Sequence, residues 1–157
     1  LAMAASVAFA LGLTLNFLQF SSAHNTLGEY ALAHIYHEQD HFHNDAEAKV
    51  SLASLNQKMA TFGGNFSSSL GDLIFADYCR FDSIKSLHLV FQGKTDTVSV
   101  IVIPNDGELT FESNFNDDKL EGFSQQFKQA NIIVVGDKNE SLEQWQENLT
   151  KNLKWNA

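Results

Sequence analysis

The pattern of hydrophobic and polar positions begins with a twenty-residue apolar run that contains no ionised side chain. A helix of that length spans about 30 Å, roughly the hydrocarbon thickness of a bilayer. We therefore predict a transmembrane helix over residues 1–22, truncated at its N-terminus, with Asn16 and Gln19 close to the interface. Two alternatives stay open: a signal peptide cleaved near Ser21-Ser22-Ala23, and a helix buried within a soluble domain.

Helical periodicity follows in two segments. Thr26-Leu-Gly-Glu29 is a capping box, in which the threonine caps the helix and the glutamate reaches back, so we predict a helix from Leu27 to Phe42. A second helix is predicted from Asp45 to Phe62, because apolar residues recur near the 3.6-residue period, and Gly63-Gly64 ends it. Its apolar stripe consists of Val50, Leu52, Leu55, Met59 and Phe62.

The period then changes to one typical of strands. The predicted strands are Leu73–Phe81, Leu87–Gln92, Thr97–Ile103, Leu109–Phe115 and Ile132–Val135. The run Thr97–Ile103 is apolar on both faces and is expected to be central, with Pro104 stopping it. Short turns between the first four strands predict an antiparallel meander.

The chain closes with another amphipathic segment. Ser141-Leu-Glu-Gln144 is a second capping box, and Leu142, Trp145, Leu149 and Leu153 share one helical face that should pack on the sheet. Trp155 is expected to extend this helix. The fold class is therefore α+β: a membrane-type helix, a helical pair, an antiparallel sheet of four to five strands and a C-terminal amphipathic helix.

Composition and charge narrow the classes of function. Residues 24–157 have the size of one domain, and the chain's 44% hydrophobic content, with 13 Phe, is enough to form a core. The net charge of −9 repels phosphate backbones, so we expect no nucleic-acid binding. The single cysteine, Cys79, excludes an intramolecular disulfide and a cysteine-rich zinc site, and is interpreted as a small buried hydrophobe.

The charges that flank the apolar run predict an orientation. Five acidic residues lie between the run and the first lysine, Lys49: Glu29, Glu38, Asp40, Asp45 and Glu47. Cytoplasmic flanks of membrane helices are rich in Lys and Arg. This flank is the reverse, so we expect residues 24–157 to lie outside the cytoplasm.

A histidine cluster supplies the one candidate for metal chemistry. His37-Glu-Gln-Asp-His41 fits the HExxH pattern of zinc proteases, and His34, His37 and His41 fall within an arc of about 60° on a helix, beside Glu38. Asp40 is an unusual middle residue for that motif, and the next histidine after His43 is His88, in a strand pattern. We therefore interpret HExxH as coincidental, and predict no catalytic residue and no cofactor. Zinc bound by His34, His37 and His41 remains the metal alternative.

From His34 onward the chain resembles uncharacterised gammaproteobacterial membrane proteins described as anti-sigma-factor-like. The resemblance rests on the apolar anchor followed by His34–Glu38, on Leu55–Gly63, on Tyr78-Cys79-Arg80, on Ser86–Gln92 and on Val98–Pro104. The order of Cys, HLVxQ and VxVxVxP is also similar to the extracytoplasmic part of some zinc-associated anti-sigma factors. The family-like positions are His34, Glu38, Cys79, His88 and Pro104.

This resemblance implies a regulator without catalytic activity. It implies a single-pass protein of the bacterial inner membrane, anchored in the lipid bilayer by Leu1–Phe20, with residues 24–157 forming a periplasmic sensory or interaction domain. A preceding cytoplasmic part would hold a sigma factor, and a homo-oligomer is compatible with this reading. The alternatives are a metal-binding protein or metal-dependent hydrolase using the His34, His37, Glu38 and His41 face, and an envelope structural protein.

Overall fold

The computed structural model describes residues 24–42 and 50–156, with only the backbone described for residues 39–42. The predicted membrane or signal helix over residues 1–22 lies outside these ranges. Within them, no helix combines the length and the hydropathy needed to cross a bilayer. The described part is an α+β fold, which confirms the predicted class.

Three α-helices accompany the sheet in the described residues. The first, α2 (Leu27–Phe42), has the predicted bounds, and Thr26 Oγ1 accepts a hydrogen bond from Glu29 N at 3.2 Å. Its Glu29 carboxylate reaches back to Asn25 N at 3.0 Å, one residue before the expected position. The third helix, α4 (Leu142–Asn152), also confirms a prediction, and its Trp145 and Leu149 are buried as expected.

The middle helix, α3 (Leu52–Met59), is shorter than predicted. The predicted start at Asp45 lies outside the described residues. Within them the helix begins at Leu52, because Ser51 is extended and its hydroxyl accepts a hydrogen bond from Ser54 N at 3.2 Å. The 3₁₀ turn η1 (Ala60–Phe62) follows, and Gly63 ends it with φ of 73°, a left-handed conformation that suits glycine.

The main sheet has six antiparallel strands in the order β2-β3-β4-β7-β6-β5. The strands are β2 (Leu73–Phe81), β3 (Ile84–Gln92), β4 (Thr97–Pro104), β5 (Asn114–Asn116), β6 (Leu120–Gln126) and β7 (Ala130–Asp137). A separate two-stranded sheet pairs β1 (Gly64–Phe66) with β8 (Leu153–Trp155). The meander is confirmed for β2, β3 and β4, and β4 is central as predicted.

Three predictions, one about an edge strand and two about the C-terminal helix, are wrong. The predicted strand Leu109–Phe115 reduces to β5, because Thr110 forms a bridge with Thr26 ahead of α2 instead of pairing with β4. The second neighbour of β4 is therefore β7. Trp155 lies in β8, opposite Gly64, because the helix gives way to an extended Leu153. Ser141 also makes no side-chain cap on α4.

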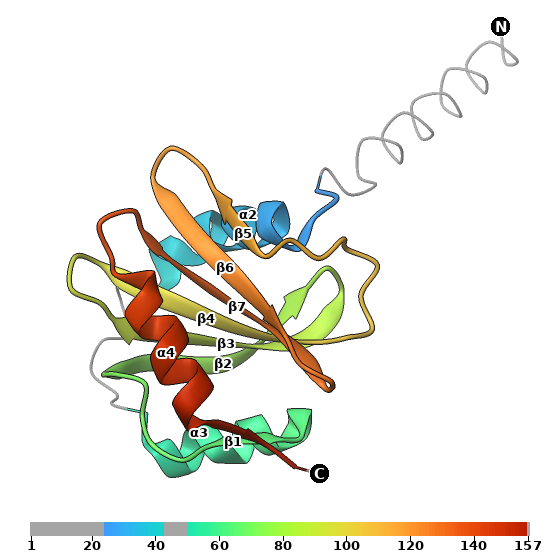
Figure 1. Cartoon of the computed structure of the whole chain (residues 1–157), viewed down its shortest axis with the longest axis vertical. Coiled ribbons are helices and arrows are strands. Elements are labelled where there is room, and N and C mark those ends of the chain that lie inside the picture. The colour runs from blue at the N-terminus through green and yellow to red at the C-terminus, as the bar shows by residue number, and fades with distance from the viewer. Residues whose placement is uncertain (1–23, 43–49, 157) are drawn as a thin grey trace, which may run out of the picture.

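The sheet separates two helical layers. In Figure 1, α4 lies in front of the sheet and α2 lies behind it. The core is divided accordingly: α3 and α4 cover one cluster, which contains Leu89, Phe91 and Trp145, and α2 covers the other, which contains Phe81 and Ile101. Helix α2 approaches the sheet so closely that a side chain at Gly28 would overlap the ring of Phe115.

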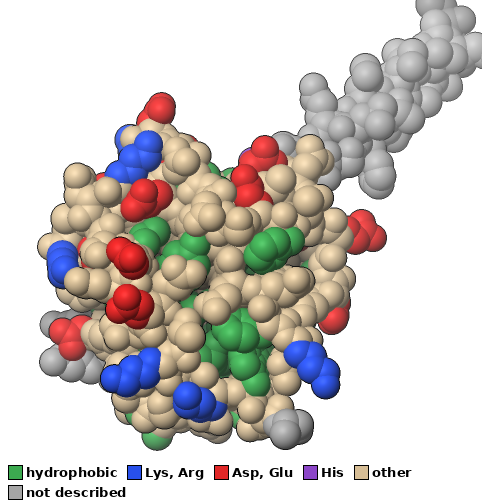
Figure 2. All heavy atoms as spheres, viewed as in Figure 1, with side chains coloured by type: hydrophobic (Ala, Val, Ile, Leu, Met, Phe, Trp, Pro, Cys, Tyr) green, Lys and Arg blue, Asp and Glu red, His purple; other side chains and the backbone are tan. Residues whose placement is uncertain are grey.

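The exposed surface follows the acidic composition. Figure 2 shows acidic side chains gathered over α4, whose outward residues include Glu143 and Glu147. On the opposite layer, Tyr36 of α2 is also exposed. Helix α4 therefore presents a polar surface to the solvent and an apolar stripe to the sheet.

Candidate functional site

The buried interface between α2 and the sheet contains ionisable side chains. Leu27, Ala31 and Ile35 are buried on α2, so this stripe faces the sheet. His34 and Glu38 lie one turn apart on that side, because residues four apart share a helical face. On β3, the alternation that buries Leu87 and Leu89 under α4 turns His88 toward α2.

One carboxylate oxygen joins the two histidines. Glu38 Oε2 lies 2.8 Å from His88 Nδ1 and 3.4 Å from His34 Nε2. The second ring nitrogen of His88, Nε2, lies 3.0 Å from Ser99 Oγ on β4. One nitrogen or oxygen atom from each of His34, Glu38 and His88 falls within 4.8 Å of the others. We call these three residues the His-Glu-His cluster.

The cluster is more enclosed at the sheet than at the helix. His88 is 0% exposed and Ser99 is 4% exposed, whereas the Glu38 side chain is 25% exposed. The His34 side chain is 8% exposed, and its Nε2 makes no hydrogen bond with the described residues. A buried ring nitrogen without a hydrogen bond is costly, which makes His34 the unusual member of the cluster.

Burial and neighbouring charges set the protonation of the helical pair. Burial lowers the pKa of His34; Glu38 opposes this effect, while His88 and His37 add to it. Burial would raise the pKa of Glu38, but the hydrogen bond from His88 and the nearby imidazoles outweigh it, so this pKa lies below its ordinary value. The arrangement therefore favours a neutral His34 beside an ionised Glu38.

The hydrogen bonds constrain the tautomer of His88. An ionised carboxylate can only accept, so His88 Nδ1–H donates to Glu38. A neutral His88 then presents an unprotonated Nε2, which accepts a hydrogen bond from the Ser99 hydroxyl. If Nδ1 carried no proton, Nε2 of the neutral ring would carry it and would donate to Ser99 Oγ. The tautomer of His88 therefore depends on whether Nδ1 donates to Glu38 or binds another group.

The chain matches the family described as "Protein of unknown function (DUF3379)" over residues 1–153. It belongs to that family. No curated protein and no solved structure matches the chain. The family description names no activity.

The order Ser99, His88, Glu38 has the hydrogen-bonding pattern of a serine hydrolase triad, but its surroundings do not support acyl transfer. Ser99 lies inside a regular strand, paired with Val90 of β3 on one side and with Val135 of β7 on the other. Its backbone groups are therefore within sheet ladders rather than free to form an oxyanion hole, which such chemistry needs.

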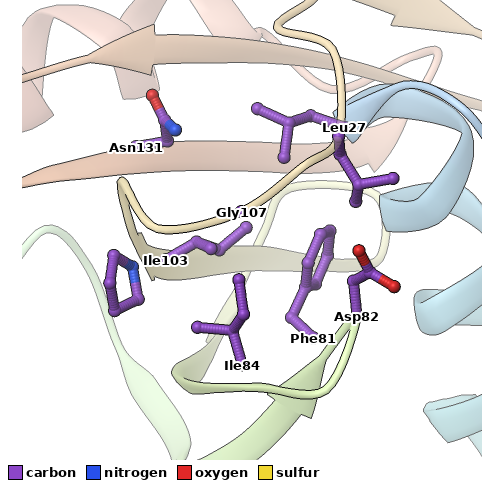
Figure 3. A pocket seen from close by; sticks show the side chains of 9 residues that line it. Leu27, Phe81, Asp82, Ile84, Ile103, Gly107 and Asn131 are labelled. Carbon is purple, nitrogen blue, oxygen red and sulfur yellow. The ribbon is translucent and has the colours of Figure 1, made fainter.

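The pockets nearby differ in size. Figure 3 shows a pocket between Leu27, Phe81 and Asn131 whose volume is about 20 Å³, enough for about one water molecule. A larger pocket of about 250 Å³ is lined by Tyr36, Ser99 and Lys119 among others. It reaches the cluster only through Ser99, on the side of His88 that faces away from Glu38.

The described side chains include two of the three candidate metal ligands. His34 belongs to the cluster, His37 is exposed on α2, and only the backbone of His41 is described. Cys79 on β2 is partly exposed rather than fully buried as predicted. Burial together with the Glu38 carboxylate raises the pKa of its thiol to about 12, so it is a neutral thiol. Pro104 ends β4 as predicted.

Sequence reasoning missed the pairing of Glu38 with His88, and it missed Ser99 altogether. A signal was present: His88 and Ser99 are polar residues inside otherwise apolar strands that are buried on both faces. Buried polar side chains must find partners, so two of them on adjacent strands predict a polar cluster. The helix that supplies the carboxylate could not be identified from the pattern.

Proposed function

We propose that this chain is the sensory or interaction domain of a membrane-anchored regulator of the anti-sigma-factor type, without catalytic activity of its own. Residues 1–20 anchor it in the bacterial inner membrane, and residues 24–157 lie in the periplasm. A cytoplasmic part that precedes the anchor holds a sigma factor. The sequence resemblance and the acidic flank of the apolar run support this assignment.

One structural observation carries the proposal. Helix α2, which follows the apolar run closely in the chain, is attached to the interior strand β3 by the hydrogen bond between Glu38 and His88, at 2.8 Å. The contact couples the segment nearest the membrane with the middle of the domain. A polar contact of this kind is easier to change than apolar packing, because a proton or a ligand alters its strength.

The mechanism is a shift between two arrangements of α2 against the sheet. A proton or a ligand that binds to the cluster, or to the surface beside it, favours one arrangement of the helix over the other. The change passes along α2 to the anchor and alters how the cytoplasmic part holds its sigma factor. The size of this shift is limited by the difference between the affinities of the proton or ligand for the two arrangements.

A reporter experiment in cells tests the proposal. Glu38→Gln in the full-length protein should change transcription from a promoter that depends on the sigma factor, because the contact with His88 loses its charge. His37→Ala is the matched control, since His37 lies on the same helix but is exposed. Protein levels of both variants are measured alongside.

The location of the domain is tested separately. A reporter enzyme that is active only outside the cytoplasm, fused after residue 157, should be active. Cytoplasmic activity of the fusion would contradict the orientation. Unchanged transcription with normally folded and normally abundant Glu38→Gln would contradict the sensory role of the contact.

A further inference from the structure

We propose that His34, Glu38 and His88 form a binding site for one divalent cation of the zinc type, held between α2 and β3. The site differs from the single-helix site that His37 and His41 would require, because one ligand comes from the sheet. It does not depend on the regulatory role proposed above.

The donor set fits the chemistry of zinc. Two imidazoles and one carboxylate are ligands that zinc takes in proteins, at about 2.0–2.2 Å. Two ligands at such distances in a tetrahedral site lie about 3.3 Å apart. The distance between His34 Nε2 and Glu38 Oε2 is 3.4 Å, close to that value. Glu38 Oε2 and His88 Nδ1 are 2.8 Å apart in a hydrogen bond, so this pair would separate slightly to take the cation, and all three donor atoms lie within 4.8 Å of one another.

His34 provides the independent indication of a ligand. Its side chain is 8% exposed, and Nε2 lies beside the Glu38 carboxylate without forming a hydrogen bond within the described chain. A neutral imidazole could form that bond if its Nε2 carried a proton in suitable geometry. A cation at the centre of the cluster satisfies Nε2 directly, since an unprotonated nitrogen binds metal through its lone pair.

Ser99 completes the outer layer of the site. A metal-bound histidine commonly donates its other ring N–H to a polar group, which fixes the tautomer and the orientation of the ring. With a cation on Nδ1 of His88, its Nε2–H donates to Ser99 Oγ, at the 3.0 Å already present. Ser99 is thus a positioning residue for His88 and not itself a ligand.

The site is accessible and incomplete. The Glu38 side chain is 25% exposed, so a cation can enter from the α2 side without passing through the sheet. Three protein ligands leave one position of a tetrahedral zinc for water or for an external donor. Magnesium and calcium prefer sites built from oxygen alone, so this donor set should discriminate against both.

The test is titration of the full chain, purified in detergent and freed of metal with a chelator, with Zn²⁺, Co²⁺ and Mg²⁺. We expect one Zn²⁺ per chain, no stoichiometric Mg²⁺, and a Co²⁺ absorption spectrum typical of four-coordinate nitrogen and oxygen ligands. His34→Gln and Glu38→Gln should each abolish the one-to-one binding. His37→Ala is the matched control and should leave it unchanged.

Circular dichroism and thermal unfolding of the metal-free variants establish that they are folded. His34 and Glu38 are chosen for substitution because they lie on a helix and are less enclosed than His88. Zinc binding that survives both substitutions but is lost in His37→Ala would place the metal on the exposed histidines and overturn the proposal. A folded wild-type chain that binds no zinc would overturn it as well.

Ser99 gives a second readout. Ser99→Ala should weaken zinc binding by about 10–100-fold, and Ser99→Thr, which keeps the hydroxyl, should restore it. Nitrogen-15 NMR of the wild type should show His88 protonated at Nδ1 without metal and at Nε2 with zinc. An unchanged tautomer after zinc addition would exclude His88 Nδ1 as a ligand.

Discussion

The two faces of the same central strands have opposite chemistry. On the face covered by α3 and α4, β3 and β4 contribute only apolar side chains to the buried cluster: Leu87, Leu89, Phe91, Val98, Val100 and Val102. On the face covered by α2, the same strands place Ser86, His88 and Ser99 among the buried residues. One face is a close-packed core, whereas the other combines packing with a hydrogen-bonded, ionisable cluster.

Two hydrogen-bonded glutamates, the buried Glu140 and the partly exposed Glu38, show what the difference means. Glu140, before α4, accepts hydrogen bonds from Lys94 N at 2.7 Å and from Trp145 Nε1 at 3.1 Å, which tie the turn between β3 and β4 to that helix. Glu38 is bound by imidazoles. Backbone and indole N–H groups do not titrate near neutral pH, but imidazoles do. Glu140 is therefore structural, while the surroundings of Glu38 can respond to protons or ligands.

The largest expected effect is on the apolar face. Phe91 is 0% exposed and packs against Trp145 with ring centroids 5.4 Å apart. Phe91→Ala should lower the free energy of unfolding by about 3–5 kcal/mol, because it removes apolar contacts and leaves a cavity. Urea unfolding measures the change. Phe111→Ala, at an exposed position, is the control and should stay within about 0.5 kcal/mol of wild type.

A smaller effect is expected at Glu140, and it depends on pH. Burial would raise its pKa, but hydrogen bonds from Trp145, Lys94 and Thr95 outweigh burial and hold the pKa below the ordinary value of 4.5. A lowered pKa in the folded state stabilises the protein above the ordinary pKa, and this contribution is lost as the pH falls through the folded-state value. Glu140→Gln should therefore cost about 1.5–3 kcal/mol at pH 7.

Urea unfolding of wild type and Glu140→Gln between pH 7 and pH 3 checks this prediction. The difference in the free energy of unfolding between the two proteins should narrow as the pH falls below 4.5. The exposed Glu143→Gln is the control and should show little difference at either pH. A difference in the free energy of unfolding that stays constant between pH 7 and pH 3 would mean that the charge of Glu140 contributes nothing to stability.

The smallest effect concerns the contact between Glu38 and His88. A double-mutant cycle with Glu38→Gln and His88→Gln, measured by urea unfolding in the presence of a chelator, should give a coupling free energy of about 0.5–3 kcal/mol at pH 7. The partial exposure of Glu38 places the expected value in the lower part of that range. Zero coupling would mean that the hydrogen bond does not fasten α2 to the sheet, which would remove the contrast between the two faces.

The local elements were largely predictable from the sequence. Helix α2 follows from its capping residues, strand β2 from an apolar run and helix α4 from its apolar periodicity, and all of these signals act over a few neighbouring residues. Strand β6 was missed because its residues, with Gly122 and a polar Ser-Gln-Gln end, do not alternate clearly. Its strand conformation is imposed by pairing with β7.

The site was predictable only in part. His34 and Glu38 were identified as neighbours on one helical face, since helical spacing is a local property. His37 and His41 share the same periodicity, and nothing local distinguishes the buried histidine from the exposed one. The rotation of α2 against the sheet decides which histidine is buried, and the close contact between Gly28 and Phe115 is part of that packing.

The sequence by itself determined the membership of the DUF3379 family, the α+β class and the presence of polar residues inside two apolar strands. Only the tertiary structure decided that β7 lies beside β4 and that His88 meets Glu38 across fifty residues of chain. The physical reason is range. Capping and periodicity act between residues close in sequence, whereas a contact between a helix and a sheet depends on how every intervening element packs.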